Sequence, residues 1–203
     1  TVKEQLDLPT GYSIVWSGQY EYMERAKEKL VYLVPVILAI IALLLYINFR
    51  IVAEVAILMG TLPFALVGSV WLIYWEGFNF SIAVGVGFIA LAGVAIETSV
   101  IMMVYLNQAY DKLLIESPEP NRSELANAVI DGAGLRVRPV MMTAAATIVG
   151  LLPILYGAGT GSEVMSRIAA PMVGGMVSAV VLTLLVLPVF FFLWRGRGKL
   201  PES

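Results

Sequence analysis

The chain has 203 residues, of which 59% are hydrophobic and only 14% charged, and its formal net charge is −2. Together with a mean hydropathy of +0.85, this composition excludes an ordinary soluble globular domain and predicts a membrane protein. Cysteine and histidine are both absent, which excludes disulfides, thiolate or imidazole metal cages and histidine acid–base relays. The chemistry must therefore rest on carboxylates, hydroxyls, thioethers and basic groups.

The N-terminal stretch is polar and has no short cleavable leader, so we expect the chain to start within a longer protein. Residues 12–17 (YSIVWS) alternate in the manner of a strand. After Gly18, a charged helix over residues 19–29 is expected to run into the first span.

Apolar stretches long enough to cross a bilayer follow, each needing about twenty residues that rise roughly 1.5 Å apiece. The five predicted spans are residues 30–49, 52–75, 81–106, 140–156 and 168–194. The links after the first two spans are very short, so the first three helices are predicted to be antiparallel neighbours. The expected fold class is an all-α membrane protein, a bundle of five transmembrane helices.

Basic residues predict the orientation of the bundle. Eight of the thirteen fall on one side of a five-span topology, namely Arg50, Lys112, Arg122, Arg136, Arg138, Arg195, Arg197 and Lys199. By the positive-inside rule this side is cytoplasmic, so the N-terminus is outside and the C-terminus inside. Arg25, Lys27 and Lys29, close to the first span, argue the other way.

A short amphipathic helix is expected on the cytoplasmic side, at residues 122–134. Asn121 and Glu124 resemble a helix-capping pair, and an apolar stripe follows them. This helix would lie along the membrane surface or the bundle, either as a plain linker or in a regulatory role.

Prolines and small residues indicate how the spans pack. Kinks without breaks are expected at Pro35, Pro63, Pro153, Pro171 and Pro188. Gly174 with Ser178, and Gly175 with Ala179, are small-residue pairs that permit close packing of the last helix.

The segment GVAIETSVIMM, residues 93–103, places Glu97 inside the third span. A buried acid costs about 2.5–3.5 kcal/mol at the centre of a membrane helix, so we expect Glu97 to face protein or water. Its neighbours Gly93, Ala90 and Ile101 form a narrow face that another helix can approach closely. Glu97 is the candidate for proton handling; the alternative is a structural hydrogen bond to Thr143 or Thr147.

Met165 is the candidate metal ligand. It lies in GAGTGSEVMSRI, expected to be a polar outer loop that runs into the last span. A thioether there can ligate Cu(I) or Ag(I). Ordinary packing is the alternative.

Six blocks resemble, in order and spacing, the C-terminal membrane half of heavy-metal efflux pumps of the resistance-nodulation-division superfamily, and most of all their copper/silver branch. They extend over essentially the whole chain and are SGQYEYMERA, LPFALVG, GFIALAGVAIE, LRVRP, GLLPILYG and GSEVMSRIAAPMVGGM.

This resemblance implies a fragment, the last five of twelve transmembrane helices. Residues 1–18 would be the tail of a periplasmic porter domain and residues 19–203 the transmembrane domain. It also implies a homotrimer in the bacterial inner membrane, with a periplasmic N-terminus and a cytoplasmic C-terminus, joined to a periplasmic adaptor and an outer-membrane channel. Glu97 matches the family's proton-relay glutamate, and Met165 matches a methionine of its stepwise metal path.

One position departs from that pattern. Where the copper/silver pumps have a relay lysine after LRVRP, this chain has Val140. Arg138 is a doubtful substitute, because two residues back on a helix points about 200° away.

The leading functional hypothesis is a proton-coupled exporter of Cu(I) or Ag(I), which is a secondary transporter and not an enzyme, with no resident cofactor and no nucleic-acid partner. A second hypothesis keeps the superfamily but changes the cargo to a divalent metal or an organic amphiphile. A third is a truncated fragment that is inactive in transport.

Overall fold

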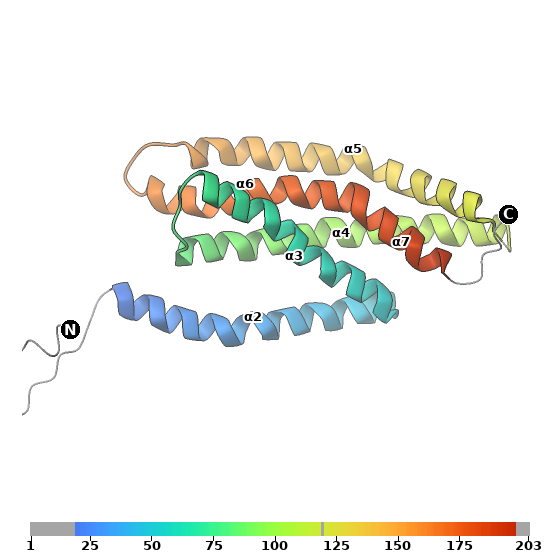
Figure 1. Ribbon diagram of the computed structural model, residues 1–203, viewed down its shortest axis with the longest axis horizontal. Helices are drawn as coiled ribbons and strands as arrows, with labels where there is room; N and C mark the ends of the chain where they lie inside the picture. The colour runs from blue at the N-terminus through green and yellow to red at the C-terminus, as the bar shows by residue number, and fades with distance from the viewer. Residues whose placement is uncertain (1–18, 119, 198–203) are drawn as a thin grey trace, which may run out of the picture. The chain divides into compact units, whose positions relative to one another are not determined.

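The computed structural model describes residues 19–118 and 120–197, and every regular element in them is a helix (Figure 1). In chain order the elements are α2 (Gln19–Phe49), α3 (Val52–Trp75), α4 (Ile82–Glu116), α5 (Arg122–Leu155), α6 (Ser162–Val181), η1 (Leu182–Val186) and α7 (Leu187–Gly196). The all-α prediction is confirmed for these residues. The predicted strand at 12–17 and the porter-domain tail at 1–18 lie outside them.

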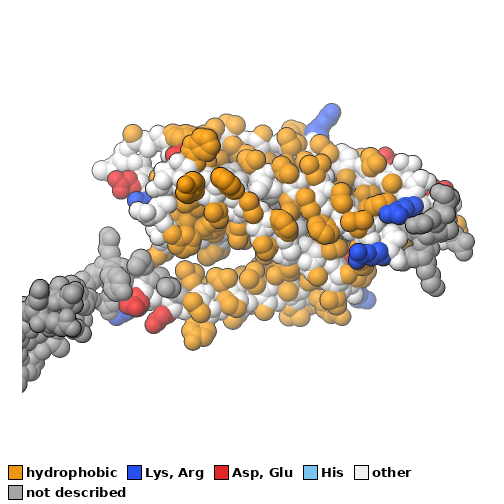
Figure 2. All heavy atoms as spheres, viewed as in Figure 1, with side chains coloured by type: hydrophobic (Ala, Val, Ile, Leu, Met, Phe, Trp, Pro, Cys, Tyr) orange, Lys and Arg blue, Asp and Glu red, His pale blue; other side chains and the backbone are white. Residues whose placement is uncertain are grey.

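Among residues 19–118 and 120–197, five helical stretches are long and apolar enough to cross a membrane, which confirms the predicted number of spans by length and composition. Figure 2 shows hydrophobic side chains over the visible length of α3 to α7, with most of the charged side chains near the helix ends. The stretches are Glu28–Phe49, Val52–Trp75, Ile82–Glu116, Arg122–Leu155 and Ser162–Gly196.

The chain divides into two compact units, residues 1–44 and 45–203. The described part of the first unit is a single helix, the greater part of α2, which passes through Pro35 without ending. From residue 30 to residue 44 this helix carries leucine, isoleucine, valine, alanine, one proline and one tyrosine, and no charged side chain. A helix that is apolar on all sides belongs in a membrane or a large core.

In the second unit α6 packs against α3, α4 and α5. The backbones of α3 and α6 approach closely where Gly68 meets Gly174, since a Cβ on either glycine would clash with the carbonyl oxygen of the other. The Ser178 hydroxyl donates to the Ala65 carbonyl at 2.7 Å and accepts from the Gly68 N–H at 3.2 Å. The close packing predicted from Gly174 and Ser178 is confirmed.

The last span contains a π-helical turn, η1, between α6 and α7. Pro188 lacks the N–H that an α-helix would direct to the Leu184 carbonyl, and a wider turn avoids the clash of its ring. Within this turn Thr183 is fully buried, and its hydroxyl lies 3.5 Å from the Ser99 hydroxyl of α4. The polar contact joins the last span to α4.

The helix that follows residue 121 differs from the prediction. Instead of a short helix at 122–134 and a separate span at 140–156, α5 is one helix from Arg122 to Leu155. Pro139 lies inside it, because one missing hydrogen bond kinks a helix without having to end it. The capping pair is confirmed at its start, where the Asn121 N–H donates to the Glu124 carboxylate at 3.0 Å.

Two other boundaries also differ. The third helix does not end near residue 106 but continues to Glu116. The last helical run starts at Ser162 rather than at 168, directly after Gly161, whose φ of 88° allows the chain to turn into the helix.

Candidate functional site

Glu97 lies in the middle of α4, in the second unit, and its side chain is exposed on the surface of that unit. The buried stripe of this helix includes Leu91, Ala95, Ser99 and Met102. Since two residues turn a helix by about 200°, Glu97 points away from Ala95 and Ser99 and from the helices they contact. Glu97, which we expect to face protein or water, is therefore not enclosed by the helices of residues 45–197.

The residues around Glu97 are small or apolar. Val86 is 48% exposed and Ile89 46%, and a Cβ added to Gly93 would meet nothing within 4 Å. We call Val86, Ile89, Gly93 and Glu97 the Glu97 face of α4. This face is an open surface, and Glu97 is the one ionisable group among its four residues.

The alternative hydrogen bond for Glu97 is not formed. Thr143 donates to the backbone carbonyls of Pro139 at 3.1 Å and Val140 at 3.0 Å, and Thr147 donates to the Thr143 carbonyl at 2.8 Å. Both hydroxyls thus bond to their own helix. Within the described residues, the Glu97 carboxylate has neither a hydrogen bond nor an ion pair.

Met165 lies in the first turn of α6 rather than in a loop, and its side chain is 52% exposed. The structure does not bring it near Glu97. Gly87 packs against Ile168 of α6, so Met165 lies beside the start of α4, and Glu97 is roughly 15 Å further along that helix. Among the described residues no group of three or more acids could hold a metal ion, so a metal at Met165 would need further ligands.

A second acid lies within the predicted spans, and sequence reasoning passed over it. Glu54, near the start of α3, is only 1% exposed. Arg195 donates to its carboxylate at 3.1 Å, and the Asn107 amide donates to its other oxygen at 3.0 Å. Arg195 also donates to the side-chain amide oxygen Oδ1 of Asn107 at 3.3 Å. The three side chains form a closed polar cluster that joins α3, α4 and α7.

Aromatic rings surround the arginine of this cluster. Its guanidinium lies 4.6 Å from the ring centre of Tyr110 and 4.4 Å from that of Trp194. Stacking of this kind favours arginine over lysine. The Nε atom of Arg195 is buried and finds no hydrogen-bond partner among the described residues.

A polar cavity of about 350 Å³ opens beside the cluster. Its walls come from the last residues of α2, from the link to α3, and from α3, α4 and α7. The lining residues are Asn48, Phe49, Ile51, Glu54, Val104, Asn107, Gln108, Asp111 and Arg195.

A sequence signal for this site exists, because residue 54 falls inside the predicted span 52–75. Glu54 at the start of that span and Arg195 at the same end of the last span are opposite charges, and this pair in the sequence would have indicated the site.

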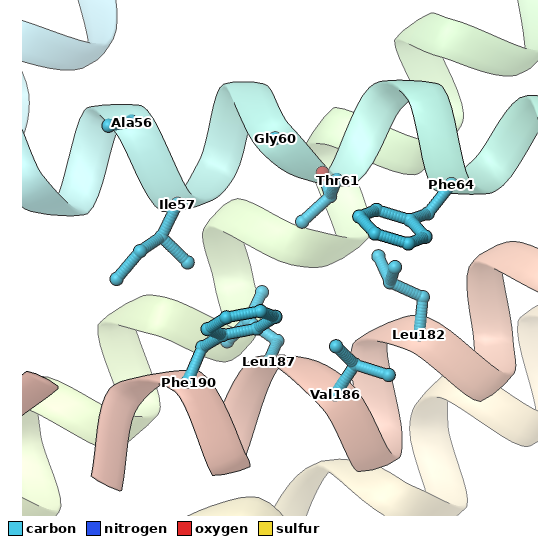
Figure 3. A pocket seen from close by; sticks show the side chains of 9 residues that line it. All are labelled: Ala56, Ile57, Gly60, Thr61, Phe64, Leu182, Val186, Leu187 and Phe190. Carbon is cyan, nitrogen blue, oxygen red and sulfur yellow. The ribbon is translucent and has the colours of Figure 1, made fainter. Parts of the chain in front are cut away.

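An apolar cavity of about 310 Å³ lies further along α3, facing η1 and α7. In Figure 3 Phe64 and Phe190 lie on its opposite sides, from α3 and α7, and the only oxygen shown on its wall is that of Thr61. That hydroxyl donates to the Leu58 carbonyl of its own helix at 2.6 Å. The cavity therefore offers space for an apolar group and no ligand for a metal.

Val140 is buried, with 2% of its surface exposed. The position where the resembled pumps carry a relay lysine thus holds a packed apolar side chain, and Arg138 is exposed.

The opposite end of the bundle carries an exposed polar pair. The Tyr156 hydroxyl donates to the Glu76 carboxylate at 3.2 Å. This hydrogen bond, followed by the repulsion between the carboxylate and a tyrosinate, raises the pKa of Tyr156 above its ordinary value.

Comparison with known proteins places the chain in a family. The model of the AcrB/AcrD/AcrF family matches residues 1–195. The chain is 48% identical over 201 residues to the cation efflux system protein CusA of Escherichia coli (strain K12), and 49% identical over 205 residues to the putative cation efflux system protein SilA of Salmonella typhimurium. Each match covers 98% of this chain and 19% of the relative.

A crystal structure of a heavy metal efflux pump is similar to the chain with a TM-score of 0.77 and 33% identity, over 97% of this chain and 19% of that chain. The chain thus spans about a fifth of the length of the relatives it matches.

The family consists of transporters rather than enzymes. Since the family model extends over nearly the whole chain and the likeness includes the arrangement of the helices, the chain belongs to the AcrB/AcrD/AcrF family, on the branch of the resistance-nodulation-division superfamily formed by heavy-metal efflux transporters.

Proposed function

We propose that this chain is part of a proton-coupled efflux pump that exports Cu(I) or Ag(I) in exchange for protons. The observation that carries the proposal is Glu97, an exposed and unpartnered carboxylate in the middle of a membrane-length helix. Facing lipid, such a group would cost about 2.5–3.5 kcal/mol. In the whole pump, of which the chain would be a fifth, other helices would cover the Glu97 face and give the carboxylate a partner.

The role of Glu97 follows from its charge. With a proton bound it is neutral and can pack against an apolar surface; without it the anion requires water or a cation. The two states therefore favour different arrangements of α4 against a covering helix. Metal binding and release elsewhere in the pump would bias that equilibrium, and this couples the two fluxes.

Met165 would hand the cargo along. Its thioether is a soft ligand, half exposed in the first turn of α6, and it suits Cu(I) and Ag(I) better than hard cations. The remaining ligands would come from other parts of the pump.

The location and assembly belong to the same proposal. The pump would reside in the bacterial inner membrane, with the end of the bundle that holds Arg195 in the cytoplasm and the N-terminus of this chain in the periplasm. It would act as a homotrimer with a periplasmic adaptor and an outer-membrane channel. The excess of basic residues at the Arg195 end supports this orientation.

A second cargo is favoured by specific observations. Val140 is buried and uncharged at the place of the relay lysine, and the cavity between α3, η1 and α7 is apolar. An uncharged Val140 would fit a pump of the same superfamily for a divalent metal or an organic amphiphile, and the apolar cavity would fit the organic amphiphile.

Glu97→Gln in the full-length pump tests the proton role. The amide keeps the shape of the side chain but cannot carry the proton, so we expect metal resistance to be lost while the protein reaches the membrane at normal levels. Resistance equal to wild type would overturn the proposal. Proton flux through the 203-residue chain alone is expected to be absent, because the covering helices are missing.

Met165→Leu tests the metal path. Leucine preserves the apolar volume and removes the sulfur, so we expect weaker Cu(I) or Ag(I) export with an unchanged Tm. Uptake into proteoliposomes should be measured with silver, zinc and a hydrophobic dye. Normal silver transport would remove Met165 from the path, and transport of zinc or dye in place of silver would favour the second cargo.

A further inference from the structure

Along the face of α4 that carries Glu97, the residues before Glu97 are apolar, whereas a polar residue, Gln108, occurs after it. Toward the start of the helix this face continues through Gly93, Ile89 and Val86, none of which has a polar side chain. Toward the other end, seven residues make two turns of a helix with a drift of only about 20°, so Val104 lies on nearly the same face as Glu97. Gln108 follows one turn later.

The polar cavity begins at that point. Val104, Asn107, Gln108 and Asp111 all line its wall. Val104 is roughly 10 Å from Glu97 along the helix axis. The cavity therefore reaches, along the face that carries Glu97, to within two helical turns of the carboxylate, and Ile101 is the side chain between.

The cavity is suited to hold water. Its volume of about 350 Å³ is ample for several molecules, and its wall carries amide and carboxylate groups. The buried Nε of Arg195, which has no partner among the described residues, would be satisfied by such a water.

Glu54 is the ionisable group that this cavity reaches inside the span. The charged groups that face it are Arg195 from α7 and Asp111 from α4, and the Asn107 amide of α4 donates a hydrogen bond to it. An ionisable side chain within a membrane helix that lines a water-accessible cavity is a functional site by default. A cluster held by hydrogen bonds on both carboxylate oxygens also keeps Glu54 in one place.

We infer that the polar cavity lined by Glu54, Asn107 and Gln108 is the port through which protons pass between Glu97 and the aqueous phase at the Arg195 end, with Glu54 as a second proton-carrying residue. The inference rests on the proposed function, because it takes Glu97 as the group that binds the transported proton.

The step balances as a simple proton transfer. The proton leaves the Glu97 carboxylic acid through water that enters past Val104, and it is taken up by the Glu54 carboxylate. Glu54 then passes it to the aqueous phase and regains its ion pair with Arg195. The net result is one proton moved and both carboxylates returned to the anion.

Cysteine accessibility tests the port in the full-length pump. This chain contributes no native cysteine, so single cysteines can be placed at Val104 and Gln108, and at Val86 as the control on the same face beyond Glu97. In a pump free of other cysteines, a membrane-impermeant maleimide added at the Arg195 side should label Val104→Cys and Gln108→Cys but not Val86→Cys. Equal labelling of Val104→Cys and Val86→Cys would overturn the inference.

Proton uptake tests the role of Glu54. For Glu54→Gln we expect proton uptake in proteoliposomes to be slower by roughly tenfold or more, with a flattened dependence on pH at the Arg195 side. Glu54→Asp should restore the pH dependence, which a merely structural role would not require. The matched control is Glu116→Gln, because this acid is exposed at the end of α4, where it pairs with Lys112 at 3.8 Å; it should behave as wild type.

The outcomes separate the two levels of the mechanism. If Glu97→Gln is inactive and Glu54→Gln has the wild-type rate and pH profile, the port is wrong and the proposed function stands. If Glu97→Gln transports normally, both are wrong.

Discussion

Glu54 and Glu97 are both acids within apolar helices, yet their surroundings are opposite. Glu54 is 1% exposed and accepts hydrogen bonds on both oxygens from residues of this chain. Glu97 is exposed, and no described residue pairs with it. The described part of the chain supplies hydrogen-bond and charge partners for the first carboxylate and none for the second. An acid left without a partner in this way indicates a site that is completed by other helices.

The largest effect on stability is expected when the partner of Glu54 is removed. Arg195→Met keeps most of the side-chain volume but leaves a buried carboxylate without its cation, a loss of about 3–5 kcal/mol for a buried pair. We expect the lower part of that range, because the Arg195 side chain is 23% exposed. The Tm of the purified chain in detergent measures it.

Arg197→Met is the control for this change, since Arg197 is exposed two residues further on. A Tm equally affected in both variants would contradict the contrast between the two acids.

A gain of about 2.5–3.5 kcal/mol is expected when Glu97 is replaced in the 203-residue chain. Glu97→Leu removes an unpartnered acid from the middle of α4, so this helix should insert into a membrane more readily. A glycosylation-based insertion assay gives the ratio of inserted to non-inserted chains. Glu116→Leu, at the end of the same helix, should change that ratio little, and an equal gain in both variants would show that position along the helix is irrelevant.

The smallest effect is expected for Glu76, an acid outside the spans. Its hydrogen bond raises the pKa of Tyr156 and favours the neutral phenol, so the bond is present below the ordinary tyrosine pKa and is lost as pH rises through the raised value. Glu76→Gln should let Tyr156 ionise at lower pH. Tyrosinate absorbance, taken as the difference from Tyr156→Phe, measures this, and an unchanged titration would contradict the contact.

The bounds of one span could be predicted well because charged residues and a glycine mark both of its ends, Arg50 before it and Glu76 and Gly77 after it. The predicted 52–75 agrees with α3, which begins after Ile51 and ends before Gly77. The end of α4 could not be predicted from hydropathy, which reports where a chain leaves lipid and not where its hydrogen-bonded helix stops. Asn107 and Gln108 are polar, yet the helix continues through them to Glu116.

The candidate site could be predicted only in part. Glu97 was identifiable because an acid in an apolar run is costly, but its exposure depends on which side of α4 the other helices cover, and apolar residues occur on both sides. The cluster at Glu54 depends on a contact between residues 141 positions apart. Such a contact leaves no local pattern in the sequence.

The meeting of Gly68 with Gly174 limits how the bundle can move. The backbones of α3 and α6 touch at these glycines, and the Ser178 hydroxyl of α6 forms hydrogen bonds with two backbone groups of α3. The two helices therefore cannot slide past each other without first separating. α3 and α6 therefore travel as a single rigid body, and any rearrangement in a working cycle has to occur at the boundaries of that pair.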